Sequence, residues 1–584
     1  MLTTSGNQFL LNGSPFRIIS GSMHYFRVPH EYWRDRMEKM VAFGLNTLET
    51  YVCWNLHEPH PEEFHFEGNL DIVRYIQTAA ELGLKVIVRP GPYICSEWEF
   101  GGLPYWLLKD PNMQVRCMYH PYLAVHDRFF DALLPRLVPL QDKHGGPIIA
   151  MQVENEYGGY GQDHEYMEYV KKSMTSRGVD VLLFTSDGAR HTLMQGGSLP
   201  GVLRTVNMPF FTKYSLDMLK KYQPEKPAMV AEFWSGWFDH WGERHHLTAG
   251  GIPSILPTLD AFNKILASGA SVNFYMFHGG TNFGFMNGAN TFSNSYQADV
   301  TSYDYACPLD EAGDPSRRYF ACRKILGKYV KLPDVPLPTA KPKKAYGKIE
   351  MTASTGLFSN LDTISHKHLS LTPGTMESYD QDYGFILYRT HISGPRPKRK
   401  CIIDGLHDRA QIYLNGIYHT TLERAGGKTT TSFAVQENGC TLEILVENMG
   451  RVNYGPWLMD RKGILGGVIF DEQLQFHWDV YPLPLSDLSA LSFEKQPTPS
   501  FPGFFKGTFQ VDETGDTFLA LPGWDKGVAW INGRNLGRYW KRGPQKTLYI
   551  PAPWLKKGLN ELVVFELYNA KSASVELRNK HDLG

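Results

Sequence analysis

Residues 147–161 read PIIAMQVENEYGGYG, and this stretch decides how the rest of the chain is interpreted. The apolar run 148–153 predicts a buried strand that leads directly into Glu154 and Glu156, and Tyr157 and the following glycines end it. Because side chains alternate between the two faces of a strand, we expect the two glutamates to point the same way. A short apolar strand that ends in two carboxylates indicates a place where a ligand binds or a reaction occurs.

Length and composition limit the class of protein. At 584 residues the chain is too long for one core, and roughly two to four domains are expected. The formal net charge of -1 gives no electrostatic reason to expect nucleic acid or a membrane surface as a partner. No run approaches the roughly 18 consecutive apolar residues of a membrane span.

Cysteine usage and the amino terminus set the expected compartment. The seven cysteines are scattered and form no CxxC pair, which fits neither a disulfide framework nor a zinc site. The terminal sequence MLTTSGNQFLLNGSPF lacks the basic segment, apolar run and cleavage site of a signal peptide. We therefore expect a reduced, cytoplasmic protein without a metal or cofactor, although a mature secreted chain that has lost its leader would look similar.

Residues 1–330 alternate apolar strand signals with amphipathic helical ones. Eight strands that alternate with helices over about 300 residues are typical of a (β/α)8 TIM barrel. A doubly wound sheet competes, but the segment after the first strand, SMHYFR, carries no Gly-x-Gly-x-x-Gly turn. The expected strands are 16–21, 47–52, 85–90, 147–153, 182–186, 203–208, 228–233 and 271–277.

A second glutamate occupies the end of a predicted barrel strand, where functional residues of this fold lie. The apolar run 229–231 ends in Glu232, and strands four and seven lie across the barrel mouth from each other. Hydrolysis of a glycosidic bond needs two such carboxyl groups, one to protonate the departing oxygen and one to attack the sugar. We expect Glu156 to be the acid/base and Glu232 the nucleophile of a retaining enzyme, with carboxyl groups about 5–5.5 Å apart.

Other interpretations of these residues stay open. A single glutamate at a strand end more commonly serves in a salt bridge, but two on opposite strands favour catalysis. Glu154 is an alternative acid; otherwise it orders the site. The histidines near strand ends lack metal-ligand spacing such as HExxH, so we interpret them as hydrogen-bonding residues. They are His24, His57 and His278.

Seven longer segments are similar to one enzyme family, in order over the whole barrel. The chain resembles glycoside hydrolase family 35, the β-galactosidases, and among them a compact, leaderless member of bacterial type. The resemblance continues more loosely to the carboxyl end. It is carried by SGSMHYFRVP (20–29), GLNTLETYVCWNLHEP (44–59), RPGPYICSEWEFGGLPYWL (89–107), QVENEYG (152–158), AEFWSGWFDHWG (231–242), FYMFHGGTNFGFMNGAN (274–290) and VTSYDYACPLDEAGD (300–314).

The resemblance implies roles for individual residues. The second glutamate of the family's NE pair, here Glu156, is its acid/base, and the glutamate of its EF motif, here Glu232, is its nucleophile. Two positions depart from the family, because Ser96 and Trp234 stand where relatives often have Ala and Tyr, which is expected to alter affinity and not the reaction class. The implied galactose-binding positions are Tyr51, Cys95, Ser96, Glu97, Asn155, Tyr275 and Tyr303.

Galactose differs from glucose in its axial 4-hydroxyl group. A site built to bond a hydroxyl rejects sugars that misplace it. Glu97, with the backbone of Ile94 to Ser96, suits the 4-hydroxyl, and Asn155 suits the 2-hydroxyl, whose hydrogen bond tightens in the transition state. Tyr454 lies in a segment that resembles a family loop over the barrel mouth. With Trp237 it is expected to stack on the sugar beyond the cleaved bond.

The composition and the hydrophobic pattern of the sequence change after residue 330. Residues 332–344, LPDVPLPTAKPKK, form a connector, and short alternating strands with Gly, Asn and Pro turns follow. A weak repeat, 409–419 and 527–537, reads in both copies as a strand, an Asn-Gly turn and a strand, which predicts two jelly-roll β-sandwich modules of galactose-binding type. The expected units are a catalytic barrel 1–330, a linker with strands 331–371, a first β-sandwich 372–482 and a second 483–584. Strands within residues 345–371 are expected to pair either with the first β-sandwich or, as an alternative, with the more distant second one.

The sequence therefore predicts a retaining exo-β-galactosidase that removes terminal β-D-galactosyl residues from oligosaccharides. The resemblance to compact members adds an expected preference for β-1,3 linkages. Two alternatives stay open: an exo-glycosidase of the same fold for another terminal sugar such as glucosamine, and an inactive carbohydrate-binding protein. The oligomeric state stays open, with a homodimer among the alternatives.

Overall fold

The structure is a computed structural model that describes residues 1–292, 295–495, 501–571 and 573–584. Its amino-terminal part is a closed barrel of parallel strands in the spatial order β10-β11-β4-β5-β6-β7-β8-β9. All eight expected strands are present, with ends that differ by a few residues. They are β4 (Ile19–Met23), β5 (Thr47–Tyr51), β6 (Lys85–Arg89), β7 (Ile148–Gln152), β8 (Leu182–Gly188), β9 (Leu203–Met208), β10 (Met229–Trp234) and β11 (Ser271–His278).

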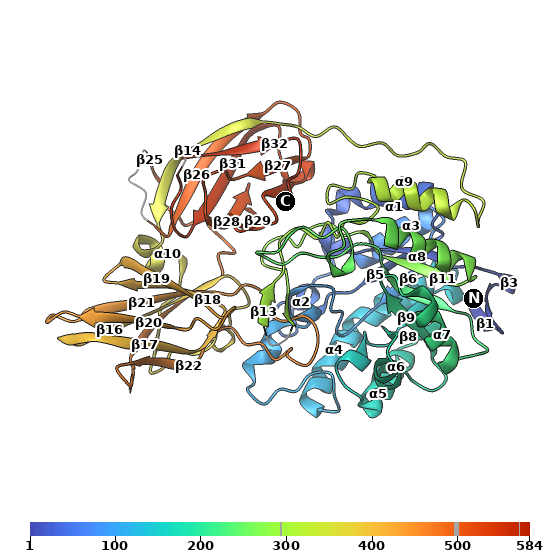
Figure 1. Ribbon diagram of the computed structural model, residues 1–584, viewed down its shortest axis with the longest axis horizontal. Coiled ribbons are helices and arrows are strands. Elements are labelled where there is room, and N and C mark those ends of the chain that lie inside the picture. Colours follow the sequence, from blue (N-terminus) through green and yellow to red (C-terminus); the bar gives the residue numbers. More distant parts are fainter. Residues whose placement is uncertain (293–294, 496–500, 572) are drawn as a thin grey trace.

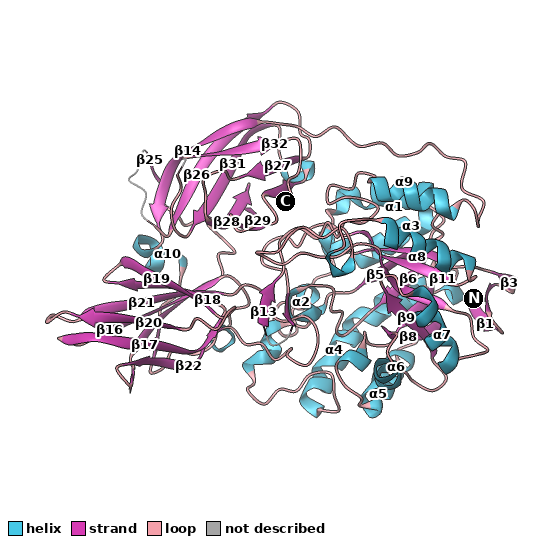
Figure 2. Cartoon of the chain, viewed as in Figure 1, coloured by secondary structure: helices cyan, strands magenta, loops and turns pink. Residues whose placement is uncertain are grey.

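Helices connect the barrel strands and cover the outside of the barrel (Figures 1 and 2). In α3 the side chain of Asp71 accepts a hydrogen bond from the Arg74 backbone N–H and caps the helix, and apolar residues three and four apart face the barrel. This arrangement confirms the predicted TIM barrel. The helices are α1 (Trp33–Phe43), α2 (Trp54–His57), α3 (Ile72–Glu81), α4 (His120–Leu137), α5 (His164–Ser176), α6 (His191–Gly197), α7 (Thr212–Tyr222), α8 (Leu256–Ala267) and α9 (Arg317–Leu326).

The amino-terminal end of the barrel is sealed by apolar packing. A small sheet of β1 (Leu2–Ser5), β2 (Gln8–Leu11) and β3 (Ser14–Pro15) contributes Leu2 and Phe9 to a cluster with apolar side chains of the barrel strands. The opposite end faces the all-β part of the molecule, and α2 and β13 (Ser295–Ala298), which follow barrel strands, lie between the two parts (Figure 1). The amino-terminal end of the barrel is therefore closed by apolar side chains, and a polar site is expected at the carboxyl ends of the strands.

The first all-β domain consists of two antiparallel sheets around one core. The larger sheet has the order β15-β24-β16-β21-β18-β19 and the smaller one β20-β17-β22-β23. Its strands are β15 (His368–Ser370), β16 (Phe385–Ile392), β17 (Arg396–His407), β18 (Arg409–Leu414), β19 (Ile417–Glu423), β20 (Thr430–Val435), β21 (Cys440–Glu447), β22 (Gly463–Phe470), β23 (Gln473–Leu474) and β24 (Trp478–Leu483).

The second all-β domain is built on β14 (Gly347–Gly356), which directly follows the connector. Residues 347–350 of β14 pair with β32, and its later residues pair with β26, so this strand crosses from one half of the domain to the other. The other strands are β25 (Glu494–Lys495), β26 (Gly503–Val511), β27 (Thr517–Ala520), β28 (Lys526–Ile531), β29 (Arg534–Trp540), β30 (Thr547–Ile550), β31 (Gly558–Glu566) and β32 (Ser574–Arg578).

The repeated hairpin of the two all-β domains is confirmed. Strands β18 and β19 are joined by Asn415-Gly416, and β28 and β29 by Asn532-Gly533. All four turn residues have a positive φ, between 49° and 79°, as the tight turn of a two-residue hairpin requires. An apolar cluster joins the two domains, and it includes Leu387 of the first and Phe504 and Phe565 of the second. Among the described residues, none of the helices combines the length and the apolar character needed to cross a membrane.

Candidate active site

A cavity of about 150 Å³ opens at the carboxyl ends of the barrel strands. Twelve of the thirteen residues predicted for the site line it. The remaining one, Tyr303, lies directly behind the cavity wall, where its hydroxyl donates to Glu97. The predicted residues in the lining are Tyr51, Ile94, Cys95, Ser96, Glu97, Asn155, Glu156, Glu232, Trp234, Trp237, Tyr275 and Tyr454.

The prediction that Glu154 and Glu156 point the same way is wrong. Strand β7 ends at Gln152, and both glutamates have left-handed φ angles of 58° and 43°, so strand alternation does not apply to them. Glu154 is fully buried, and both of its oxygens accept hydrogen bonds from the Arg116 guanidinium, at 2.9 and 2.7 Å. It lies outside the cavity, whereas Glu156 lines it.

Glu232 is surrounded by hydrogen-bond donors. Its Oε1 accepts from Arg89 Nη1 at 2.6 Å and from the Tyr51 hydroxyl at 2.6 Å, and its Oε2 accepts from Trp234 Nε1 at 2.9 Å. Arg89 is itself buried and also faces Glu49, with 3.7 Å between Nε and Oε1. Glu232 therefore accepts one hydrogen bond from a cationic donor and two from neutral donors.

Glu156 has far fewer donors. Its Oε1 accepts one hydrogen bond, at 2.9 Å, from Asn207 Nδ2, and the Asn207 amide is oriented by the Ser186 hydroxyl, which donates to its Oδ1 at 2.5 Å. Burial, and then the negative charge of Glu232, raise the pKa of Glu156 to about 8. At neutral pH Glu156 is therefore largely protonated.

A second wall of the cavity is made by residues 95–97, after β6. Cys95, Ser96 and Glu97 have left-handed φ angles of 59°, 65° and 47°, which turn three consecutive side chains at the cavity. The Arg27 guanidinium holds this turn, because its Nη1 donates to Ser96 Oγ at 2.8 Å and its Nη2 donates to the Ser96 carbonyl. Burial raises the pKa of Glu97 to about 7.

Asn155 lies between the two walls. Its Oδ1 lies 2.8 Å from the Tyr51 hydroxyl, whose single proton is shared with Glu232 Oε1, and its Nδ2 donates to the Ile94 carbonyl at 3.1 Å. On the other side, the Tyr275 hydroxyl donates to Ser96 Oγ at 3.1 Å. These bonds fix the positions of the polar groups before any ligand arrives.

The sequence analysis missed several residues of the site. Three line the cavity, namely Phe238, Asn290 and Tyr305. All three lie in segments that resemble the family, so the resemblance could have identified them as site residues. Arg89 on β6 bonds Glu232 of β10, and Asn207 on β9 bonds Glu156, which follows β7. Neither pair of strands is adjacent, so only the closed barrel brings these residues together.

Tyr454 reaches the cavity from the first all-β domain. It belongs to the loop 449–462, between β21 and β22, and its hydroxyl packs against Gly159 of the barrel. Asn453 joins the loop to the barrel, because its Nδ2 donates to the Ala289 carbonyl at 2.9 Å and its Oδ1 accepts from Cys95 Sγ at 3.4 Å. The site is therefore composed of two domains.

Buried ion pairs hold both ends of the loop 449–462. At one end Arg451 meets three carboxylates: that of Glu99, that of Glu377 at 2.6 Å and that of Asp382 at 3.1 Å. At the other end Lys462 Nζ lies 2.7 Å from an oxygen of Asp408. Such pairs are costly to break, because the partner left behind is a buried, uncompensated charge.

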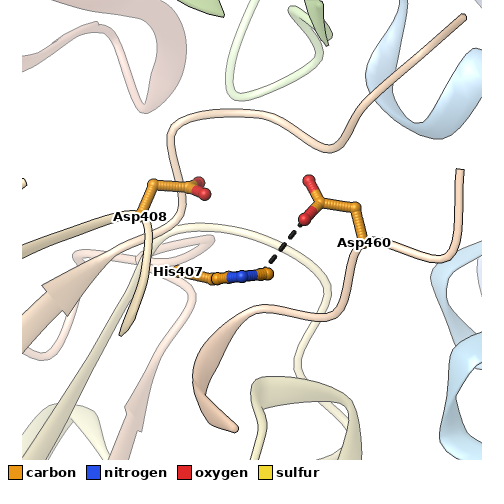
Figure 3. Close-up of side chains that lie close together, drawn as sticks. All are labelled: His407, Asp408 and Asp460. Atoms are coloured by element: carbon orange, nitrogen blue, oxygen red, sulfur yellow. Dashed lines mark ion pairs between the residues drawn. The ribbon is translucent and has the colours of Figure 1, made fainter. Parts of the chain in front are cut away.

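One cluster has the residue types of a metal site. His407, Asp408 and Asp460 offer ligand atoms within 4.8 Å of one another, and the dashed line in Figure 3 marks the His407–Asp460 ion pair. The two carboxylates already share the ammonium of Lys462, at 2.7 and 2.8 Å, and the guanidinium of Arg424, at 3.0 and 2.6 Å. Because two cations occupy the position that an ion would take, these residues do not fit a metal.

Two of the histidines considered in the sequence analysis have hydrogen-bond partners. His24 Nδ1 accepts from Arg27 Nη1 at 2.7 Å, and the ring of His57 bonds the Tyr25 hydroxyl at 2.5 Å and the His65 carbonyl at 2.6 Å. Both are buried.

A barrel whose cavity holds two carboxyl groups in different environments, joined to two all-β domains, has the architecture of a glycoside hydrolase. Comparison with known proteins agrees. The model of Glycosyl hydrolases family 35 matches residues 8–329, that of the β-galactosidase first all-β domain 373–484, and that of the β-galactosidase galactose-binding domain 502–560. The chain belongs to glycoside hydrolase family 35.

Curated relatives align over nearly the whole chain. Human β-galactosidase-1-like protein 2 is 45% identical over 97% of this chain and 89% of its own length. The β-galactosidase of Bos taurus is 42% identical over 97% of this chain and 90% of its own length. Human β-galactosidase is 42% identical over 98% of this chain and 87% of its own length.

Proposed function

We propose that this protein is a retaining exo-β-galactosidase in which Glu156 is the acid/base and Glu232 the nucleophile. The single observation that carries the assignment is the contrast between the two carboxyl groups that line one cavity. Glu232 accepts three hydrogen bonds, one of them from a buried guanidinium, whereas Glu156 accepts one from a neutral amide. Two carboxyl groups in such different environments divide acid and nucleophile between them.

In the first step a Glu232 oxygen attacks the anomeric carbon of the terminal galactosyl unit. The bond from that carbon to the glycosidic oxygen breaks, and the Glu156 proton passes to this oxygen, so the shortened glycan leaves as an alcohol. The galactosyl unit is then joined to Glu232 as an ester. Formation of the ester removes the charge on Glu232, which is one cause of the raised pKa of Glu156.

In the second step Glu156 takes a proton from water while the water oxygen attacks the anomeric carbon. The ester bond breaks, Glu232 recovers its carboxylate, and galactose leaves with its original β configuration after two inversions. Arg89 and Tyr51, both 2.6 Å from Glu232 Oε1, stabilise the departing carboxylate. The enzyme returns to its starting protonation state.

The size of the cavity supports exo action. A volume of about 150 Å³ lies below the roughly 300–1,000 Å³ of pockets for larger ligands and suits one sugar ring. We assign the axial 4-hydroxyl of galactose to the wall around Glu97 and the 2-hydroxyl to Asn155. A buried acceptor such as Glu97 is left unpaired by a sugar that misplaces the hydroxyl, which disfavours that sugar.

Tyr454 and Trp237 line the same cavity from two domains, and we assign them to the sugar beyond the cleaved bond. A β-1,3 preference would follow from the angle at which these rings receive that sugar. Replacement Tyr454→Ala is then expected to change the ratio of kcat/KM between β-1,3- and β-1,4-galactosyl disaccharides. An unchanged ratio would remove Tyr454 from this role.

Chemical rescue tests the two roles separately. With an activated aryl β-galactoside and azide, Glu232→Gly is expected to give α-galactosyl azide, because azide replaces the nucleophile in a single inversion. The matched variant Glu156→Gly is expected to give β-galactosyl azide, because azide attacks the ester on Glu232. NMR of the products distinguishes the two anomers. Reversed products would exchange the two roles, and wild-type enzyme that releases α-galactose would refute retention.

A further inference from the structure

A second cavity, of about 410 Å³, lies between the barrel and the first all-β domain. The barrel contributes Pro59, His60 and Tyr105, and the all-β domain contributes the segment 379–383 and parts of 364–368 and 482–486. We call it the accessory cavity. Its volume is more than twice that of the catalytic cavity, and the described residues that line the two cavities are different.

Aromatic rings from both domains line the accessory cavity. Two of its tyrosine rings are fixed, because the Tyr105 hydroxyl donates to the Asp380 carbonyl at 3.2 Å and the Tyr379 hydroxyl donates to the Pro373 carbonyl at 2.6 Å. The ring of His368 lies 5.3 Å from that of Tyr379. Pre-positioned rings of this kind offer apolar area at a low cost in conformational entropy, which suits the C–H faces of a sugar.

The polar part of the lining is rich in hydrogen-bond acceptors. Gln381 Nε2 donates to the carbonyls of Tyr383 and Phe385, at 2.8 and 2.6 Å, and this fixes the amide so that the buried Gln381 Oε1 has no partner among the described residues. Beside it, Asp382 is 19% exposed. Asp380, which is exposed, and Asp382 are the acceptors that a ligand with hydroxyl donors would satisfy, whereas the buried Gln381 Oε1 lies beneath the lining.

The charge of the lining selects against anions. Asp380 and Asp382 carry carboxylates, and Asp382 shares the single guanidinium of Arg451 with Glu99 and Glu377. Burial, and the negative charges of Glu99 and Glu377, raise the pKa of Asp382 to about 7, against the opposing effect of Arg451. Lysine and arginine are absent from the described lining. Asp380 is paired with Lys109, whose Nζ lies 2.6 Å from its Oδ1 outside the lining. A phosphate or an acidic sugar would still meet two carboxyl groups in the lining and is disfavoured relative to a neutral ligand.

We propose that the accessory cavity binds a neutral oligosaccharide segment of a glycan. The inference rests on the proposed β-galactosidase function and deepens it, because it names substrates longer than a disaccharide as the preferred class. Bound in this cavity, a glycan is held near the enzyme while terminal units enter the catalytic cavity. The gain is an increase in local concentration, which lowers KM for long substrates and leaves the chemical steps unchanged.

Binding is tested first with the catalytic cavity blocked by the iminosugar 1-deoxygalactonojirimycin. Calorimetric titration with the neutral tetrasaccharide lacto-N-tetraose is then expected to show one further binding event. The double variant His366→Ala/Asp380→Asn, in which both side chains are exposed, is expected to weaken this event at least tenfold. The matched control Asp362→Asn/Lys367→Ala alters exposed neighbours outside the lining and is expected to leave it unchanged. His60→Ala alters the barrel side of the same cavity and is expected, independently, to weaken the same binding event.

Kinetics provide the second measurement. The double variant is expected to raise KM for the tetrasaccharide about fivefold or more, with kcat/KM for 2-nitrophenyl β-galactoside equal to that of wild type. The proposal is overturned if the blocked wild-type enzyme does not bind the tetrasaccharide, or if the double variant binds the tetrasaccharide as tightly as wild type does. It is also overturned if the accessory cavity binds the cation tetramethylammonium, which aromatic rings also attract, and not the tetrasaccharide. Failure of wild-type enzyme to cleave the aryl galactoside would refute the proposed function, and the binding titration would still decide the role of the accessory cavity.

Discussion

Removal of one hydroxyl group separates the two chemical steps of the proposed mechanism. Tyr51→Phe deletes the donor that lies 2.6 Å from Glu232 Oε1 and leaves the Arg89 and Trp234 donors in place. The lost hydrogen bond stabilises the Glu232 carboxylate, which exists before the first step and forms again in the second. In the variant the Glu232 carboxylate is therefore a less stable and more reactive nucleophile in the first step, and a poorer leaving group in the second.

The size of the effect follows from the kind of hydrogen bond. A hydrogen bond to a charged group contributes about 1.5–3 kcal/mol, and about 1.4 kcal/mol corresponds to a factor of ten in rate. We expect hydrolysis of the ester on Glu232 to slow by roughly 10- to 100-fold. Formation of the ester is expected to change much less, because the lost stabilisation of the free carboxylate favours it. The Tyr51 hydroxyl also lies 2.8 Å from Asn155 Oδ1, so a small loss common to both steps is expected.

Stopped-flow kinetics with 2,4-dinitrophenyl β-galactoside measure both steps. The variant is expected to show a burst of one dinitrophenolate per enzyme, a lowered kcat and a nearly unchanged kcat/KM, because kcat/KM reports the steps up to ester formation. Tyr275→Phe is the matched control, since its hydroxyl bonds Ser96 Oγ and does not touch Glu232. Equal losses in kcat and kcat/KM without a burst would refute the reasoning.

Three further predictions concern charge. Because the pKa of Glu156 is raised to about 8 and the acid must be protonated for the first step, kcat/KM is expected to fall as pH rises through about 8; a decline already complete at pH 6 would contradict this. Glu154→Gln leaves the buried Arg116 without its carboxylate and is expected to lower the free energy of unfolding by about 3–5 kcal/mol, whereas Glu156→Gln is expected to abolish activity at nearly wild-type stability; chemical denaturation distinguishes the two. Lys462→Met is expected to cost about 3–5 kcal/mol in the same assay, because it leaves two buried carboxylates without this cation, and stabilisation of the wild-type protein by zinc or calcium would contradict the conclusion that the cluster is no metal site.

The barrel and most of its site could be predicted because their signals are local. Barrel strands such as β7 and β10 are short apolar runs, and polar residues follow where the run ends. The orientation of Glu154 and Glu156 could not be predicted, because it depends on where β7 stops. The strand ends at Gln152, before either glutamate, and left-handed backbone angles then set each side chain separately.

Residues that act from a distance in sequence could not be predicted. Arg89 meets Glu232 only because β6 and β10 belong to one closed barrel, and no pattern around Arg89 specifies that partner. Asn207 likewise reaches Glu156 from β9. The accessory cavity exists only where two domains dock, so its residues, among them Tyr105 and Tyr379, carry no common signal along the chain.

The path of β14 has a consequence for how the chain is made. This strand is synthesised before the whole first all-β domain, yet its pairing partners β26 and β32 come after that domain, the latter only at residues 574–578. During translation residues 347–356 therefore leave the ribosome with an unpaired edge, and more than 200 further residues must be made before β32 can pair with it. The barrel and the inserted domain can fold in order of synthesis, but the second all-β domain closes only when β32 has emerged, and a chain truncated before β32 would keep an open strand edge that is prone to aggregation.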